Sequence, residues 1–228
     1  MTPISPSGDT AARLLRALEE RGPRPALVWY AEEGRTELSG HVLANWVIKS
    51  IGHLADEVGL VAGDDLVLDL APHFKRLVLA LAGWSLGLSV RIADDATDAA
   101  GLADGGGGTL AVATDRPDSA QAAAADEVLA LEARALSLAF GGELPPLARD
   151  WAQEMRGSSD RLTTPLGPWS GPDPVDAPDS GAVLAGSDGA DGAVDAASVL
   201  GALLAGRTVV APSGSVDAAA ARAEGVTG

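Results

Sequence analysis

The feature that most restricts the fold is an apolar strand–helix–strand pattern in the first half of the chain. Leu66 to Leu70 is a short apolar run after an acidic turn, which is typical of a buried strand. After Pro72, the segment from Phe74 to Gly87 is apolar on most sides and predicts a buried helix; Leu88 to Ile92 predicts another strand. Such a βαβ unit places its two strands parallel in one sheet. We therefore expect an α/β fold with a mostly parallel central sheet flanked by helices.

The segment before this unit predicts a helix, a β-hairpin and a longer helix. Leucines at helical spacing indicate a first helix that ends at Gly22. Ala26 to Ala31 is rich in strand-forming residues, and Thr36 to Leu38 would be the returning strand. Ser39 can cap an amphipathic helix that ends near Gly59.

The second half has shorter elements and one clear interruption. Residues 164–181 contain five prolines, three glycines and three aspartates, which predicts a linker or an extended surface loop. We expect three regions: an α/β region over 1–163, this loop, and a strand–helix–strand over 182–228 that completes the sheet and has a frayed or flexible tail. The smaller elements expected are strands at 109–114, 128–131, 136–140, 182–185 and 207–211, and helices at 120–126, 147–155 and 193–205.

Composition narrows the possible partners. The formal net charge is −16, from 32 acidic and 16 basic residues, so nucleic acid and anionic membrane surfaces are not expected as partners. The chain has no cysteine, and no apolar run approaches the roughly 20 residues that span a bilayer. We expect a cytoplasmic protein. Only two lysines occur beside many Arg, Ala, Gly and Asp residues, as a GC-rich bacterial genome would produce.

The stretch GAVLAGSDGADG, residues 181–192, resembles a loop that wraps a phosphate. It lies between a predicted strand and a predicted helix, where backbone N–H groups and the helix dipole favour an anion. However, Leu162 to Gly206 contains six aspartates and no Lys or Arg, and both the Walker and the calcium-loop spacings are missing. Three readings stay open: a plain polar connection, a degenerate phosphate loop, or a working site.

Other side chains suggest little chemistry. The three histidines, His41, His53 and His73, lack partners at metal-ligand spacing and are expected to be exposed or at helix ends. Asp69 lies either at a solvated strand edge or buried at the carboxyl end of the sheet, where ligands gather in parallel α/β folds.

A family resemblance adds to this reading. The segments PALV (25–28), ELSG (37–40) and VGLVAGD (58–64), followed by the βαβ unit, look like the N-terminal region of the adenylate-forming, AMP-binding enzymes, the acyl-CoA synthetase superfamily. The match covers roughly residues 23 to 95, and faintly 109 to 211. The chain is also similar to a family of short bacterial proteins of unknown function that share this distant similarity.

Against that superfamily's signature loop, Gly186, Ser187 and Gly189 keep the pattern. Gly192 stands where the lysine would be, and Asp188 replaces a hydroxyl residue. The resemblance thus implies a remnant of a phosphate loop at Gly186, Ser187 and Gly189, with no catalytic residue, no metal ligand and no cofactor.

The function expected from the sequence is accordingly not enzymatic. We expect a catalytically degenerate, AMP-binding-enzyme-like domain that binds a protein partner or a small ligand; a homo-oligomeric scaffold is a further option. The alternative is an adenylate-forming enzyme that activates an acid with ATP and works with a separate C-terminal domain.

Overall fold

The computed structural model describes residues 10–93, 107–134, 136–186 and 196–226. Contacts divide the chain into two compact units: Met1–Trp46 with Pro172–Gly228, and Val47–Gly171. The described strands of each unit form one sheet. In the first of these units the N-terminal hairpin pairs with the last strands of the chain. The expected regions 1–163, 164–181 and 182–228 stay a prediction. The helices of the described ranges include none long and apolar enough to cross a membrane.

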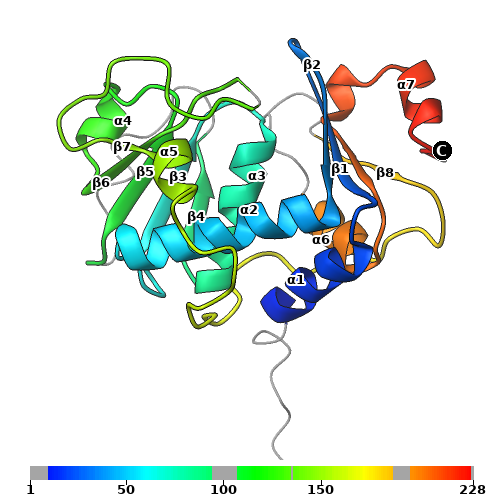
Figure 1. Ribbon diagram of the computed structural model, residues 1–228, viewed down its shortest axis with the longest axis horizontal. Helices are drawn as coiled ribbons and strands as arrows, with labels where there is room; N and C mark the ends of the chain where they lie inside the picture. Colours follow the sequence, from blue (N-terminus) through cyan, green and yellow to red (C-terminus); the bar gives the residue numbers. More distant parts are fainter. Residues whose placement is uncertain (1–9, 94–106, 135, 187–195, 227–228) are drawn as a thin grey trace, which may run out of the picture. The chain divides into compact units, whose positions relative to one another are not determined.

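The first unit is a four-stranded sheet with two helices packed together, α1 and α6 (Figure 1). Its strand order is β2-β1-β9-β8; β1 and β2 form the predicted antiparallel hairpin, whereas β9 is parallel to both β1 and β8. The elements are α1 (Thr10–Arg21), β1 (Pro25–Ala31), β2 (Gly34–Ser39), β8 (Val183–Leu184), α6 (Ala196–Leu204) and β9 (Val209–Ala211).

One arginine joins the distant chain segments of this unit. The guanidinium of Arg21, the last residue of α1, donates to the Pro25 carbonyl, to the Gly206 carbonyl and, over 2.6 Å, to the Thr208 hydroxyl. These contacts connect the end of the first helix with the start of β9, about 185 residues later in the chain.

The C-terminal tail is a capped helix rather than a frayed or disordered end. Asp217 Oδ1 accepts hydrogen bonds from two backbone N–H groups at the start of α7 (Ala218–Ala223). Glu224 then accepts from the Tyr30 hydroxyl at 2.9 Å and from the Arg35 guanidinium at 2.7 Å. The tail is therefore fixed to the hairpin by polar contacts.

The second unit contains the expected parallel sheet. Its order is β4-β3-β5-β6-β7, and every neighbouring pair is parallel. Helix α3, which connects β3 to β4, is buried along its whole length, as the apolar pattern predicts. The elements are β3 (Asp65–Asp69), α3 (Phe74–Leu86), β4 (Ser89–Ile92), β5 (Leu110–Thr114), α4 (Ala120–Ala123), β6 (Glu127–Ala130), β7 (Arg149–Asp150) and α5 (Trp151–Met155).

The predicted long helix is present but changes its winding. Ser39 Oγ accepts from the Val42 N–H at the start of α2 (Gly40–Gly52), as an N-cap does. After Gly52 the chain continues as a π-helix, η2 (His53–Glu57), which ends before Gly59. Such π-segments are rare in proteins, and many of those that occur lie at functional sites.

One element predicted after β6 is absent, and the next one, α5, starts later than predicted. Residues 136–140 form no strand, and Leu136 and Leu138 are about two-thirds exposed, at 65% and 63%. The next helix starts at Trp151 rather than at Leu147, because Leu147 has a left-handed φ of 71° that a helix cannot include. Asp150 caps the helix by accepting from the Gln153 N–H.

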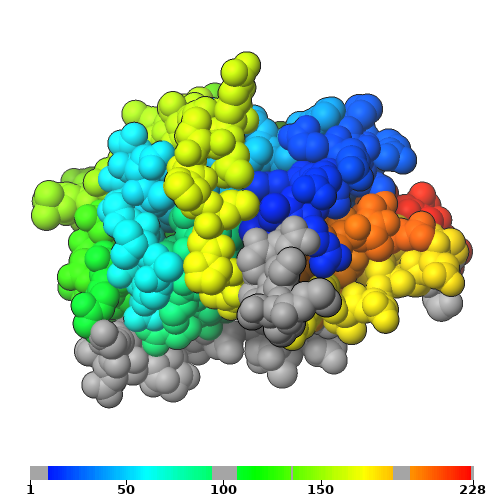
Figure 2. All heavy atoms as spheres, turned by 90° about the horizontal axis from the view of Figure 1, so that it is seen from below, coloured from blue at the N-terminus to red at the C-terminus, as the bar shows by residue number. Residues whose placement is uncertain are grey.

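The proline-rich segment, residues 164–181, packs against the end of α3 and the residues that follow it. The Gly167 N–H donates to the Ser85 carbonyl at 2.9 Å, and the Ser170 hydroxyl donates to the Leu88 carbonyl at 2.6 Å. Trp169 is 9% exposed, with its ring 5.9 Å from that of Trp84. Further along, the Val175 N–H donates to the Ala197 carbonyl, and Figure 2 shows this yellow stretch beside the orange segment that contains α6.

Replacing Gly167 by alanine tests this packing. An added Cβ would lie 2.2 Å from the Leu86 carbonyl oxygen, so Gly167→Ala should lower the free energy of unfolding by about 1–3 kcal/mol. Gly214→Ala is the matched control, because its Cβ meets nothing within 4 Å. Urea denaturation followed by tryptophan fluorescence measures both. Equal stability of the two variants would mean that the segment is not held against α3.

Candidate functional site

The glycine-rich stretch lies between a strand and a helix, as predicted. β8 ends at Leu184 and α6 begins at Ala196. Gly186 packs so closely against the chain after β9 that an added Cβ would lie 2.3 Å from the Ser213 nitrogen. This contact explains glycine at position 186 without any ligand. Ser187 and Gly189 lie outside the described residues, so the phosphate-loop remnant at Gly186, Ser187 and Gly189 stays a prediction.

Three arginines in the described part of the first unit, Arg21, Arg35 and Arg207, bind other groups of the protein. Arg21 donates to the Gly206 carbonyl and Arg207 to the Asp179 carbonyl, both next to the amino end of β9. Gly186 lies at the opposite end of this strand, beside the residues that follow the carboxyl end of β9. Arg35 follows the carboxyl end of β1 and binds two carboxylates, Glu37 at 2.6 Å and Glu224 at 2.7 Å. These hydrogen bonds raise the pKa of Arg35 and lower that of Glu224.

The second unit has a topological switch point. From β3 the chain crosses through α3 to β4 on one side, and the next strand, β5, lies on the other side of β3. In open α/β sheets such divergence leaves a crevice at the carboxyl ends of the two central strands, where ligands bind. The last residues of these strands are Asp69 and Thr114, which pair in register.

Asp69 and Thr114 form a polar cluster with Arg116. Asp69 is 3% exposed and accepts from the Thr114 hydroxyl at 2.9 Å and from the Arg116 guanidinium at 2.8 Å. The buried carboxylate is thereby satisfied, which is the usual condition for burying such a charge. The Arg116 side chain is 53% exposed, and its Nε also lies 3.8 Å from Asp115 Oδ1, so a guanidinium oriented by two carboxylates reaches solvent at the switch point.

More positive charge is buried at the same edge. Lys75, 1% exposed near the start of α3, donates from Nζ to the carbonyls of Glu132 and Arg134 at 2.6 and 2.7 Å, just after β6. Arg76, 4% exposed, donates to the Leu70 carbonyl just after β3. His73 caps α3 by accepting from the Lys75 N–H at 3.1 Å. Together with the helix N-terminus, these cations suit an anionic ligand.

This edge was only partly predictable. Asp69 proves to be buried at the sheet end, the second of the two placements considered. Lys75 and Arg116 were not singled out, although each follows a predicted parallel strand within a few residues, which is the signal that could have found them.

The histidines differ from one another in environment. His41 is exposed and lies 3.0 Å from a Glu19 oxygen. His53 was expected to be exposed or at a helix end; it starts the π-helix but is fully buried, with Nε2 3.2 Å from Glu154 Oε2. Among the described residues, no group of three or more His, Asp or Glu side chains is placed to hold a metal ion.

Solved structures show the same fold. A Brucella canis acyl-CoA synthetase matches with a TM-score of 0.61 and 16% identity, over 87% of this chain and 42% of that chain. A Streptomyces lividans acetoacetyl-CoA synthetase matches with a TM-score of 0.63 and 15% identity, over 88% of this chain and 38% of that chain. The N-terminal subdomain of Klebsiella oxytoca NpsA in complex with 3-hydroxybenzoyl-AMSN matches with a TM-score of 0.54 and 14% identity, over 92% of this chain and 55% of that chain.

These similarities confirm the expected resemblance at the level of the fold. The chain has the α/β fold of the N-terminal part of adenylate-forming enzymes and spans about 38–55% of the length of those three chains. Scans against protein-family models and against curated proteins found no match.

The burial of His53 predicts a pH dependence of stability. Burial lowers the pKa of His53 below its ordinary value of 6.5, an effect that the neighbouring Glu154 partly offsets. Because the unfolded chain takes up the proton first, the free energy of unfolding should fall as pH drops below about 6.5 and level off once the folded-state pKa is passed.

Urea denaturation at a series of pH values measures this slope. His53→Gln should remove it in that window, whereas His41→Gln, which changes an exposed histidine, should keep it. An unchanged slope in His53→Gln would contradict the assignment.

Proposed function

We propose that the chain is a binding module for a small anionic ligand, built on the fold of adenylate-forming enzymes, that does not activate acids with ATP. The observation that carries the proposal is the separation of charge between the two units. The glycine-rich loop of the first unit has aspartates at 188, 191 and 195 and Gly192 in the lysine position. The carboxyl edge of the second sheet has Lys75, Arg76 and Arg116.

Electrostatic energies argue against a triphosphate at the loop. Two like charges about 4 Å apart repel by ~4 kcal/mol at an effective dielectric near 20. A carboxylate at Asp188 or Asp191 facing a phosphate would therefore offset much of what the backbone N–H donors provide. Catalysis of phosphoryl or adenylyl transfer relies on cations that stabilise the developing charge, and residues 162–206 contain none.

The switch point of the second unit offers better chemistry for an anion. Arg116 has a half-exposed guanidinium whose orientation is set by the buried Asp69. A guanidinium fixed in this way suits the planar fork of a carboxylate or a phosphate. We therefore place the ligand at the carboxyl ends of β3 and β5 and expect a small metabolite with a carboxylate or a phosphate group.

Two other functions have some support. The similar solved structures include acyl-CoA synthetases, which favours ATP-dependent acid activation together with a separate C-terminal domain. The exposed Leu136, Leu138 and Leu147 favour a module that binds a protein partner or a second copy of the chain. A cytoplasmic location accords with the cysteine-free sequence in either case.

Nucleotide titration separates the binding module from the enzyme. Calorimetric titration with ATP and Mg²⁺, and with AMP, should show no binding at the loop, and ATP–pyrophosphate exchange should be absent, because the loop has no cation. Exchange activity, or ATP binding that Ser187→Ala weakens about tenfold or more, would overturn the proposal. Gly186→Ala is unsuitable for this test, because it collides with Ser213 whether or not a ligand binds.

Thermal shift locates the anion site. Inorganic phosphate and a panel of small carboxylates and phosphate esters should include a compound that raises the melting temperature, because a ligand at 100 times its Kd stabilises by about 2.7 kcal/mol. Arg116→Ala should abolish that shift. Arg16→Ala, which removes an exposed positive charge on α1, should preserve it. Equal shifts in the two variants would place the ligand elsewhere.

A further inference from the structure

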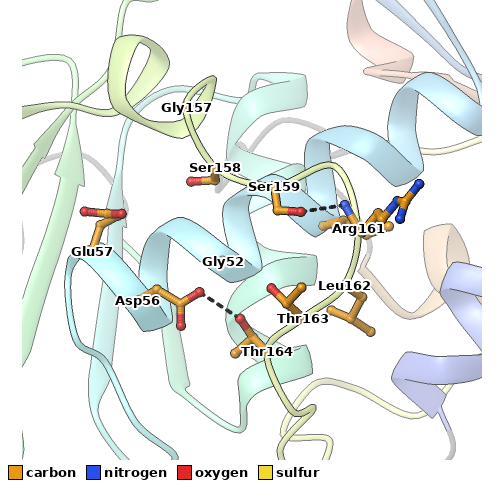
Figure 3. Close-up of a pocket in the computed structure, with 11 residues that line it drawn as sticks. Gly52, Asp56, Glu57, Gly157, Ser158, Ser159, Arg161, Leu162, Thr163 and Thr164 are labelled. Carbon is orange, nitrogen blue, oxygen red and sulfur yellow. Dashed lines mark hydrogen bonds between the residues drawn. The ribbon is translucent and has the colours of Figure 1, made fainter.

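A pocket in the second unit takes no part in the anion site. It has a volume of about 160 Å³ and lies between residues 48–57 and 157–164 (Figure 3). Its Asp56 carboxylate accepts from the Thr164 hydroxyl at 3.1 Å, and Arg161 also lines it, so the pocket favours neither a cation nor an anion. A more specific preference is found at the edge of the first sheet.

The outermost strand of the hairpin, β2, forms one edge of the first sheet. It stands first in the order β2-β1-β9-β8 and pairs only with β1 among the described strands (Figure 1). In such an edge strand, every second residue directs its backbone N–H and C=O away from the neighbouring strand, where another chain can pair with them. The edge of β2 is thus able to accept a further strand.

The hairpin turn determines which residues of β2 face outward. The turn has two residues, so its closing pair, Ala31 and Gly34, is hydrogen-bonded. Because hydrogen-bonded pairs alternate with non-hydrogen-bonded ones, Thr36 also directs its backbone groups toward β1. The backbone groups of Arg35 and Glu37 face outward, and no other segment in the described part of the chain bonds to them. The side chains of both residues are 40% exposed.

The opposite charges of Arg35 and Glu37 make this edge complementary to itself. When two copies of β2 pair antiparallel about Thr36, Arg35 of each copy lies opposite Glu37 of the other copy. Both pairs are of the hydrogen-bonded kind, so four backbone hydrogen bonds form. The four side chains lie on one face of the joined sheet and alternate in sign around a square. Parallel pairing in register would instead place like charges side by side, which is destabilising.

The Arg35 guanidinium has donors left for this contact. Its Nε and Nη2 bind Glu224, and Nη2 also binds Glu37 of the same strand at 2.6 Å. Nη1 makes no hydrogen bond with the described residues, so it is available to Glu37 of a second copy. The contact between Arg35 and Glu224 is therefore compatible with the pairing of two copies.

We propose that β2 pairs antiparallel with β2 of a second copy of the chain, so that two four-stranded sheets join into one. The dimer is independent of the anion site and has two-fold symmetry, the commonest symmetry of soluble homo-oligomers. A second copy fits better than another partner, because the same edge supplies both each charge and its complement. The contact is short, so the Kd should be weaker than about 1 µM, since even interfaces of about 1,600 Å² can be that weak.

Sedimentation velocity of the whole chain, from about 10 µM to about 1 mM, tests for the dimer. A buffer with about 150 mM salt screens the repulsion between two chains of net charge −16, because the Debye length is then about 8 Å. The sedimentation coefficient should rise with concentration toward that of a dimer. A monomer at every concentration would overturn the proposal.

Charge reversal tests the contact between the two side chains. Glu37→Arg should weaken dimerisation about tenfold, because like charges then lie opposite each other while Arg35 keeps its contact with Glu224. Glu20→Arg changes the net charge by the same amount at an exposed position of α1 and should have little effect. Equal Kd values for the two variants would contradict the proposed edge contact.

Mixing two variants tests the antiparallel register. Arg35→Glu and Glu37→Arg each place like charges opposite each other in their own dimers, whereas a mixed pair restores opposite charges at both positions. An equimolar mixture should therefore dimerise more strongly than either variant alone. Thermal melting checks that both variants are folded, since Arg35→Glu also loses the contact with Glu224. A mixture no stronger than its components would rule out this register.

Amide hydrogen exchange, followed by NMR, locates the contact without any substitution. In dilute solution the Arg35 and Glu37 amides should exchange faster than the Thr36 amide, because Thr36 faces β1. At high chain concentration the exchange of Arg35 and Glu37 should slow several-fold. Slowing near the exposed Leu136 and Leu138, with no change at β2, would place the interface in the second unit and refute the proposal.

Discussion

The parallel pairing of β3 with both β4 and β5 is the constraint on which the second unit depends. The parallel pair β3–β4 requires a crossover connection, which is α3, a helix that is buried along its whole length. Because the crossovers that follow β3 and β5 lead in opposite directions, to β4 and to β6, the carboxyl ends of β3 and β5 form a topological switch point, where ligands bind in open α/β sheets. Asp69 and Thr114 occupy these ends in register, and they set the orientation of Arg116. The same topology brings Lys75 to the carbonyls that follow β6.

Charge is distributed unevenly over this fold. The loop where a nucleotide-binding enzyme needs cations carries aspartates, while buried and half-exposed cations gather in the second unit. Binding energy follows such local charge rather than the net charge of −16. The shared fold with acyl-CoA synthetases therefore says little about activity, because function depends on the groups that a fold presents.

Apolar runs and the turn residues that separate them predicted most of the elements correctly. The hairpin, the βαβ unit and α6 are apolar segments whose length and flanking Gly and Pro residues separate strands from helices. The failures fall where local pattern and local geometry disagree. The alternating leucines at 136 and 138 resemble a strand, yet both side chains are exposed. A helix was predicted from residue 147, yet Leu147 adopts a left-handed conformation. The π-winding after Gly52 left no recognisable trace in the sequence.

The fold class, the resemblance to the N-terminal part of adenylate-forming enzymes and the lack of cations in the glycine-rich loop all follow from the amino-acid sequence alone. These are properties of local pattern and composition, which a single chain displays directly. Only the tertiary structure decided that the first hairpin pairs with the last strands, that the proline-rich segment packs against α3, and that Asp69 meets Arg116. The physical reason is that pairing and packing join residues from distant parts of the chain, and hydrophobic burial does not specify these partners until the strands are placed in order.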